Sequence, residues 1–200
     1  LGPKNLATVC KDLKIPLVHI STDYVFDGKK TEPLKENDNL GPQTAYGKTK
    51  LEGEQFIQKI LDEYFIIRTA WLYGCDGNNF VKTMLNLSKS HNEINVVNDQ
   101  IGSPTFTYDL AKGISEIIKT DKYGVYHLTN SGSCSWYEFS KEIFKLANIN
   151  VKVTPVTTEE FPRPAPRPKY SVLSNDKWIK QGFKPLRNYK EALKEYLLTC

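Results

Sequence analysis

Hydrophobic positions along the chain switch between helical and strand-like spacing. Apolar residues recur every three or four positions in six stretches, each of which predicts an amphipathic helix: residues 4–14, 45–61, 80–90, 108–119, 136–146 and 189–198. Short apolar runs between them predict buried strands: PLVHIS (16–21), YFIIRTAWLYG (64–74), INVVND (94–99) and GVYHLTN (124–130). This alternation of helix and strand favours an α/β fold with a largely parallel sheet.

Two segments do not follow either period. Residues 27–44 contain two glycines and two prolines and form a long connection, and long ordered loops are often functional. Residues 155–171 are dense in proline, and we expect them to run extended over the surface.

Composition limits the function classes. The net charge is +4, but basic and acidic residues alternate along most of the chain, which argues against a nucleic-acid groove and allows attraction for a small anion. No apolar run approaches the ~18 residues of a membrane span, and the first residues do not resemble a signal peptide. The four cysteines form no C-x-x-C pair, which predicts reduced thiols in a cytoplasmic protein rather than disulfides or a zinc site.

The segment AYGKTK carries the first candidate chemistry. Tyr46 and Lys50 are four residues apart in a predicted helix, so both side chains emerge on the same face. A nearby ammonium group favours the phenolate form of a tyrosine, and such a pair can act as a general acid or base near neutral pH. The same spacing also occurs by chance on many helices, so the pair needs support from other residues.

That support comes from two strand ends. STDYVFDG follows the strand at residues 16–21 and offers the hydroxyl of Thr22 to a substrate carbonyl, while RTAWLYG places Trp71 and Tyr73 at the end of the next strand. Ligands of open α/β sheets bind at the carboxyl ends of the strands. We therefore expect these residues to converge with Tyr46 and Lys50 on one active-site crevice.

In their order along the chain, several blocks resemble the dTDP-4-dehydrorhamnose reductases, a family of extended short-chain dehydrogenases: STDYVFDG, YGKTKLEGE, RTAWLYG, NFVKTML, VVNDQIGSPT, DLA and HLTNSGSCSWYEFS. The resemblance implies a Rossmann-type parallel sheet with a smaller α/β sugar-nucleotide domain. Residues 1–70 would form the C-terminal half of the dinucleotide-binding domain, and residues 71–200 mainly the substrate domain, with some segments returning to the sheet.

The resemblance also implies a reaction. NADPH or NADH would reduce the 4-keto group of dTDP-4-dehydro-L-rhamnose to give dTDP-L-rhamnose, for polysaccharide biosynthesis. Tyr46 resembles the proton donor, Lys50 the residue that holds the nicotinamide ribose, and Thr22 the helper hydroxyl. Asp23, Tyr24 and Trp71 match positions that contact the nucleotide sugar. The resemblance is compatible with a homodimer.

Other polar residues have two readings each. Asn79, Gln100 and Thr105 lie in the matching blocks and either line the pocket or cap turns. Arg163 and Arg167 either pair with a diphosphate or are solvated loop residues. We interpret His19 as a packed, hydrogen-bonded core residue and Trp136, Tyr137 and Phe139 as core residues of the small domain. No carboxylate cluster indicates a metal site.

No Gly-rich phosphate-binding turn occurs in the sequence, although members of this family begin with one. By resemblance, roughly 80 residues that precede Leu1 in such proteins are absent here. We expect a chain of these residues alone to be inactive, to bind nicotinamide cofactor weakly and to associate through the exposed edge of strand 16–21.

Two other functions remain open at this stage. An epimerase or dehydratase of another nucleotide sugar would share the tyrosine and lysine. A non-catalytic subunit, like the regulatory subunit of methionine adenosyltransferase, would share the fold without turnover.

Overall fold

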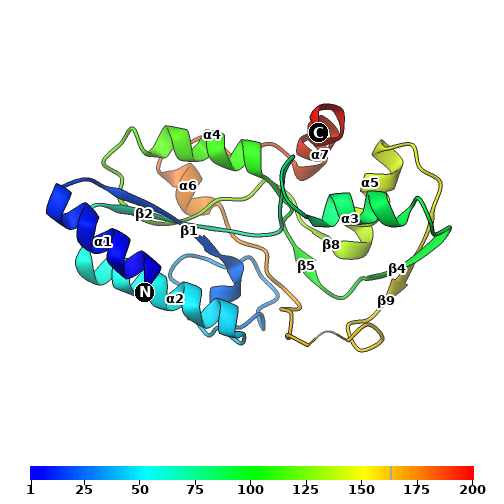
Figure 1. Cartoon of the computed structure of the whole chain (residues 1–200), viewed down its shortest axis with the longest axis horizontal. Helices are drawn as coiled ribbons and strands as arrows, with labels where there is room; N and C mark the ends of the chain where they lie inside the picture. Colours follow the sequence, from blue (N-terminus) through cyan, green and yellow to red (C-terminus); the bar gives the residue numbers. More distant parts are fainter. Residues whose placement is uncertain (163) are drawn as a thin grey trace.

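Three parallel strands form the main sheet of the computed structural model, which describes residues 1–162 and 164–200 (Figure 1). They are β1 (Leu17–Thr22), β2 (Tyr64–Thr69) and β7 (Gly124–His127), and β2 lies in the middle. Thr22 aligns with Thr69, so β1 and β2 end level with each other. The predicted α/β fold with a parallel sheet is confirmed.

Helices cover both faces of this sheet (Figure 1). On one face lie α1 (Gly2–Leu13) and α2 (Ala45–Ile60), and on the other lie α4 (Thr107–Ile117) and α6 (Asp176–Lys180). Successive side chains of β2 point to opposite faces, so Ile66 packs with α1 and α2 while its two neighbours pack with α4 and α6. The fully buried Trp178 anchors the short helix α6, which the hydrophobic pattern does not predict.

The remaining elements form a second region to one side of the main sheet (Figure 1). Its helices are α3 (Phe80–Leu87), α5 (Trp136–Leu146) and α7 (Tyr189–Thr199). Its strands form three short pairs: β3 (Leu72–Tyr73) with β6 (Thr105–Phe106), β4 (Glu93–Val97) with β9 (Lys152–Val156), and β5 (Ile101–Gly102) with β8 (Cys134–Ser135). Tyr73, Phe106, Phe139 and Tyr196 fill its core. No helix of the described residues is long and apolar enough to cross a membrane.

The prediction of one strand over residues 64–74 is wrong. β2 ends at Thr69, and the next two residues lead to β3, which pairs with β6 in a different sheet. Trp71 has a φ of 48°, a left-handed conformation that is uncommon for a residue with a bulky side chain. The apolar run is continuous because β2 and Tyr73 are buried and Leu72 is apolar although exposed, and the turn between the two strands has neither Gly nor Pro to mark it.

The long connection at residues 27–44 follows a 3₁₀ turn (Asp23–Val25) and is held by hydrogen bonds to residues far along the chain. The N–H of Leu34 donates to the carbonyl of Val172 (2.9 Å), and the N–H of Ser174 donates to the carbonyl of Leu34 (2.7 Å). The carboxylate of Glu36 accepts a hydrogen bond from the backbone N–H of His127 (2.9 Å). The expected surface path of residues 155–171 is therefore only partly right: the first two belong to β9, and Ser171 is buried.

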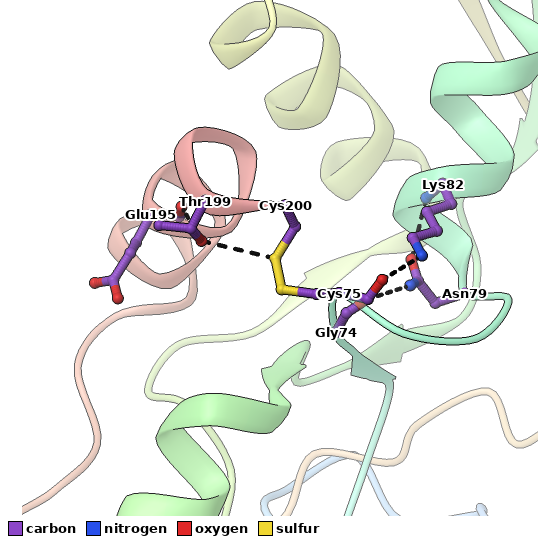
Figure 2. Close-up of a disulfide and its surroundings, with 7 residues drawn as sticks. All are labelled: Gly74, Cys75, Asn79, Lys82, Glu195, Thr199 and Cys200. Atoms are coloured by element: carbon purple, nitrogen blue, oxygen red, sulfur yellow. Dashed lines mark hydrogen bonds between the residues drawn. A yellow bond between two sulfur atoms is a disulfide. The ribbon is translucent and has the colours of Figure 1, made fainter.

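The prediction of four reduced thiols is also wrong for this structure. A disulfide joins Cys75, in the loop after β3, to Cys200, just after α7 (Figure 2). Figure 2 shows that Asn79 and Lys82 hold the same loop from the other side, through the carbonyls of Gly74 and Cys75. The two cysteines are 125 residues apart in sequence, so only tertiary packing brings them together. Cys10 and Cys134 are buried and free.

Reducing this disulfide is expected to lower Tm. A bond that closes a loop of this length restricts the unfolded chain, and native disulfides typically contribute about 2–4 kcal/mol. For a chain of this size that corresponds to a fall in Tm of about 5–15 °C. Thermal unfolding with and without dithiothreitol measures it.

The Cys75→Ser variant is the matched control, because it leaves Cys10 and Cys134 in place. Its Tm should equal that of the reduced protein and should not respond to dithiothreitol. Alkylation of four thiols in the unreduced, unfolded protein would contradict the disulfide.

Candidate active site

A cavity of about 370 Å³ lies at the carboxyl ends of β1 and β2. Six of its lining residues are the candidates selected from the sequence: Thr22, Asp23, Tyr24, Tyr46, Lys50 and Trp71. They come from three separate segments of the chain, as the convergence argument expected. Of the residues expected to converge on one crevice, Thr22, Tyr46, Lys50 and Trp71 line this cavity, and Tyr73 does not. Their roles stay a prediction.

The N-terminal half of α2 supplies Tyr46 and Lys50. Thr44 caps this helix and its hydroxyl accepts a hydrogen bond from the N–H of Gly47 (3.0 Å). Tyr46, in the first turn, is 55% exposed. Lys50 is half-buried, and its Nζ donates to the carbonyl of Ile20 on β1 (2.5 Å). Burial lowers the pKa of Lys50, and the nearby carboxylate of Glu54 opposes that shift.

Thr22 is the last residue of β1, and Asp23 is the first residue of the 3₁₀ turn that follows it. The Thr22 hydroxyl accepts from the N–H of Tyr24 (3.3 Å) and donates to Oδ1 of Asp23 (2.9 Å). Oδ2 of Asp23 is buried and has no hydrogen-bond partner among the described residues. Burial raises the pKa of Asp23 to about 6, although the hydrogen bond from Thr22 lowers it. Asp23 lines the cavity beside Thr22.

Tyr24 follows β1 and contacts Tyr46 of α2 at the wall of the cavity. Its ring meets the Tyr46 ring edge to face, with 5.7 Å between centroids. Burial and the charge of Asp23 raise the pKa of Tyr24, while the charge of Arg167 opposes them. Tyr24 therefore stays a neutral hydrogen-bonding group beside the Tyr46 phenol.

Two stacked indoles, those of Trp71 and Trp136, form another wall of the cavity. Trp71 and Trp136 lie parallel within 5°, and their ring centroids are 3.4 Å apart. Gly102 makes room for this pair, because a Cβ at that position would lie 2.3 Å from Cε2 of Trp71. Trp71 has a left-handed backbone, and its indole stacks on Trp136, the first residue of α5.

The Gly102→Ala substitution is expected to displace Trp71 and to lower the free energy of unfolding by about 1–3 kcal/mol, the usual cost of overpacking. Near-UV circular dichroism should lose the signal of the stacked indoles. Gly2→Ala is the control, because a Cβ at Gly2 meets no atom within 4 Å. An unchanged near-UV spectrum in Gly102→Ala would contradict the close contact.

The other candidates divide into two groups. Gln100 and Arg167 line the cavity, and Gln100 also donates to the hydroxyl of Thr158 (3.0 Å). Asn79 caps α3, and the hydroxyl of Thr105 donates to the carbonyl of Ser103, so both residues have structural roles. Tyr73 is buried in the core of the second region, because the break at Trp71 turns it away. Arg163 lies outside the described residues.

Two expectations need revision. The expectation that His19 is a hydrogen-bonded core residue is wrong: its side chain is only half-buried, and its Nε2 has no hydrogen-bond partner among the described residues. Trp136 packs against the core as expected, yet it also lines the cavity, which the sequence reasoning missed. The capping box of Ser135 and Glu138 starts α5 at Trp136. A tryptophan at the first position of a capped helix is the sequence signal that could have indicated that Trp136 lines a cavity.

A second cavity, of about 430 Å³, adjoins the first. It shares Tyr24, Trp136 and Arg167 with it and is otherwise mostly apolar, with Phe80 and Phe161 among its lining residues. Within the described part of the chain, no cluster of three or more His, Cys, Asp or Glu residues could hold a metal ion.

The sequence is similar to those of known proteins. The chain is 49% identical over 180 residues to the spore coat polysaccharide biosynthesis protein SpsK of Bacillus subtilis, covering 90% of this chain and 63% of that protein. It is 41% identical over 201 residues to dTDP-4-dehydrorhamnose reductase of Streptomyces griseus, covering 97% of this chain and 66% of that one.

Two solved structures are also similar to this chain. A dTDP-4-dehydrorhamnose reductase of Clostridium acetobutylicum is 57% identical, with a TM-score of 0.96 over 98% of this chain and 70% of that chain. The reductase of Bacillus anthracis, in complex with NADP, is 47% identical, with a TM-score of 0.97 over 100% of this chain and 71% of that chain.

The chain spans about two thirds of the length of these curated relatives. The family model described as the RmlD substrate binding domain matches residues 1–200. The chain belongs to the RmlD substrate binding domain family.

Proposed function

We propose that the protein reduces the 4-keto group of dTDP-4-dehydro-L-rhamnose to give dTDP-L-rhamnose, with NADPH or NADH as the reductant. The single observation that carries the proposal is the meeting of Thr22, Tyr46 and Lys50 in one cavity at the strand ends. The relatives named as reductases of this substrate support the choice of substrate. The same relatives make an epimerase, a dehydratase or a non-catalytic subunit less favoured.

The residues present fit the nicotinamide end of such a cofactor. An ammonium has three donors, and Lys50 uses one on the carbonyl of Ile20, which leaves donors for the ribose hydroxyls. The exposed hydroxyl of Tyr46 stands on the same helix face. When bound, the nicotinamide supplies the hydride.

Tyr46 would donate the proton. As the C4 carbon of the sugar accepts hydride, the carbonyl oxygen becomes an alkoxide and takes the phenolic proton of Tyr46, which then regains a proton from water. Lys50 stabilises the phenolate with its positive charge. Thr22 would orient the same oxygen, and to do so its hydroxyl proton must turn from Asp23 to the ligand.

The rest of the substrate would be held by the other walls. Asp23 and Trp71 line the cavity and would contact the sugar. Arg167 lines both neighbouring cavities and offers a guanidinium to the diphosphate. The mostly apolar second cavity suits the nucleobase.

This proposal includes the organisation of the protein. Residues 1–70 would be the catalytic half of the dinucleotide-binding domain, and residues 71–200 mainly the substrate domain, with β7 returning to the main sheet. A cytoplasmic location and a homodimer belong to the proposal as well. Light scattering of the purified protein tests the homodimer.

Reductase activity of the native gene product tests the function. We expect oxidation of NADPH or NADH that depends on dTDP-4-dehydro-L-rhamnose, with dTDP-L-rhamnose identified by mass spectrometry and NMR. The same assay with dTDP-glucose is the control for a dehydratase. Conversion of the keto sugar without net oxidation of the cofactor would point to an epimerase and refute the proposal.

A further inference from the structure

A buried ion pair stands directly behind the cavity. Glu54 lies on α2, one turn after Lys50 and two turns after Tyr46, so all three side chains share one face of the helix. Its partner is Arg68 on β2. Glu54 is fully buried, and Arg68 is 2% exposed.

The pair ties α2 to both strands that end at the cavity. Arg68 grips Glu54 with two groups, Nη2 to Oε2 (2.7 Å) and Nε to Oε1 (3.0 Å). The hydroxyl of Ser21 donates to the same Oε1, and Ser21 immediately precedes Thr22 on β1. The carboxylate of Glu54 therefore fixes the distance between the helix that carries Tyr46 and Lys50 and the strand that carries Thr22.

Arg68 extends the connection to the loop at residues 27–44. Its Nη1 donates to the carbonyl of Glu36 (3.2 Å), and its guanidinium lies 5.2 Å from the ring centre of Phe26. Helix, two strands and loop thus meet at this ion pair. The helix and both strands line the cavity described above, and the loop lines a neighbouring cavity of about 540 Å³ that also includes Tyr24.

Stability alone does not account for the pair. Taking two charges out of water costs about as much as their attraction returns, and an apolar pair of similar volume is often equally stable. A buried ion pair does, however, impose a geometry that apolar side chains would not, because both partners must keep their hydrogen bonds.

Charged and titratable groups surround Glu54 from each packed element. They are Lys50 on α2, His19 on β1 and Arg68 on β2. Burial lowers the pKa of Lys50, and the charge of Glu54 opposes this shift. Burial and the charge of Lys50 lower the pKa of His19, and the charge of Glu54 opposes them. Removing Glu54 should therefore lower the pKa of Lys50 further.

We propose that Glu54 and Arg68 are positioning residues, which hold α2 against β1 and β2 so that Tyr46 and Lys50 face Thr22 across the cavity. The inference rests on the proposed function for its kinetic consequences. The structural consequences of the inference do not depend on the proposed function, because they can be measured in the protein without substrate.

Two variants separate positioning from stability. Glu54→Met with Arg68→Met replaces both charges by apolar side chains and should keep Tm within a few degrees. Glu54→Asp keeps the charge but shortens the side chain by one methylene, so that α2 or Arg68 must shift. In both variants we expect kcat to fall about 10- to 100-fold, because small displacements of reacting groups are costly, while KM changes less than about threefold.

Titration of Lys50 by NMR of lysine-labelled protein gives a readout independent of activity. The pKa of Lys50 should fall in the double Met variant and stay close to that of the parent in Glu54→Asp. Asp109→Asn is the control for breaking an ion pair elsewhere, since Asp109 binds Arg187 (2.8 Å) and neither lines the cavity. It should lower Tm without changing kcat or the Lys50 titration.

The outcomes are distinguishable. Parental kcat in either variant would overturn the positioning role. If the parent protein has no reductase activity, the proposed function fails, and the position of α2 relative to β1 in a crystal structure of Glu54→Asp then decides the inference: an unshifted α2 and an unshifted Arg68 would overturn it.

Discussion

The Tyr46→Phe variant is expected to lose at least about 100-fold in kcat while its fold is unchanged. The substitution removes only the hydroxyl, which is the proposed proton donor, and general acid catalysis typically contributes 10²- to 10⁴-fold. The ring is 55% exposed and keeps its edge contact with Tyr24, so the free energy of unfolding should change by less than about 0.5 kcal/mol. Steady-state kinetics and thermal unfolding of the same preparation measure both effects.

Tyr108→Phe is the matched control, because Tyr108 is a tyrosine of similar exposure (49%) in the first turn of α4, outside the cavity. Its kcat should equal that of the parent. A Tyr46→Phe variant that turned over at the parental rate would exclude Tyr46 as the proton donor.

The Asp23→Asn variant is expected to be more stable than the parent at neutral pH and to bind substrate more weakly. Burial raises the pKa of Asp23 to about 6 from 3.8, so the folded protein holds a proton that the unfolded chain has released. The stability due to that proton is present below about pH 4 and is lost as the pH rises through 6. Above pH 6 the parent therefore carries a penalty of about 3 kcal/mol that asparagine avoids.

Urea unfolding of both proteins between pH 4 and pH 8 measures this difference. It should grow from near zero at the acid end to its full value above pH 6. The exposed Asp12→Asn variant controls for the loss of one negative charge. A stability difference that does not change with pH would show that the Asp23 carboxylate is not penalised by burial. Stability gained at the cost of binding would mark Asp23 as a functional compromise.

Most helices could be predicted from the sequence because each buries one apolar face, which gives its apolar residues the helical period. The turn at Trp71 could not, since a left-handed tryptophan is held by its stacking on Trp136, a contact between residues 65 positions apart. Helix α6 is too short to show a period, and one buried tryptophan secures it. The disulfide was missed because no local spacing relates Cys75 to Cys200.

The candidate site was predictable where strand ends and helical spacing bring residues together. Thr22, Tyr46 and Lys50 were found in this way, from one strand and the helix that packs beside it. Glu54 follows Lys50 at the same helical spacing, but its meaning depends on Arg68, which looks like an ordinary polar interruption of a buried strand. Burial of that pair is a tertiary property, and the sequence pattern contains no measure of it.

The indole of Trp136 forms a wall of both adjoining cavities. A smaller side chain there would enlarge two compartments together and remove the support of Trp71. A substitution of Trp136 that changes which ligand the first cavity accepts would therefore also change the shape of the second cavity. Compensating substitutions in the two cavities would have to be selected together.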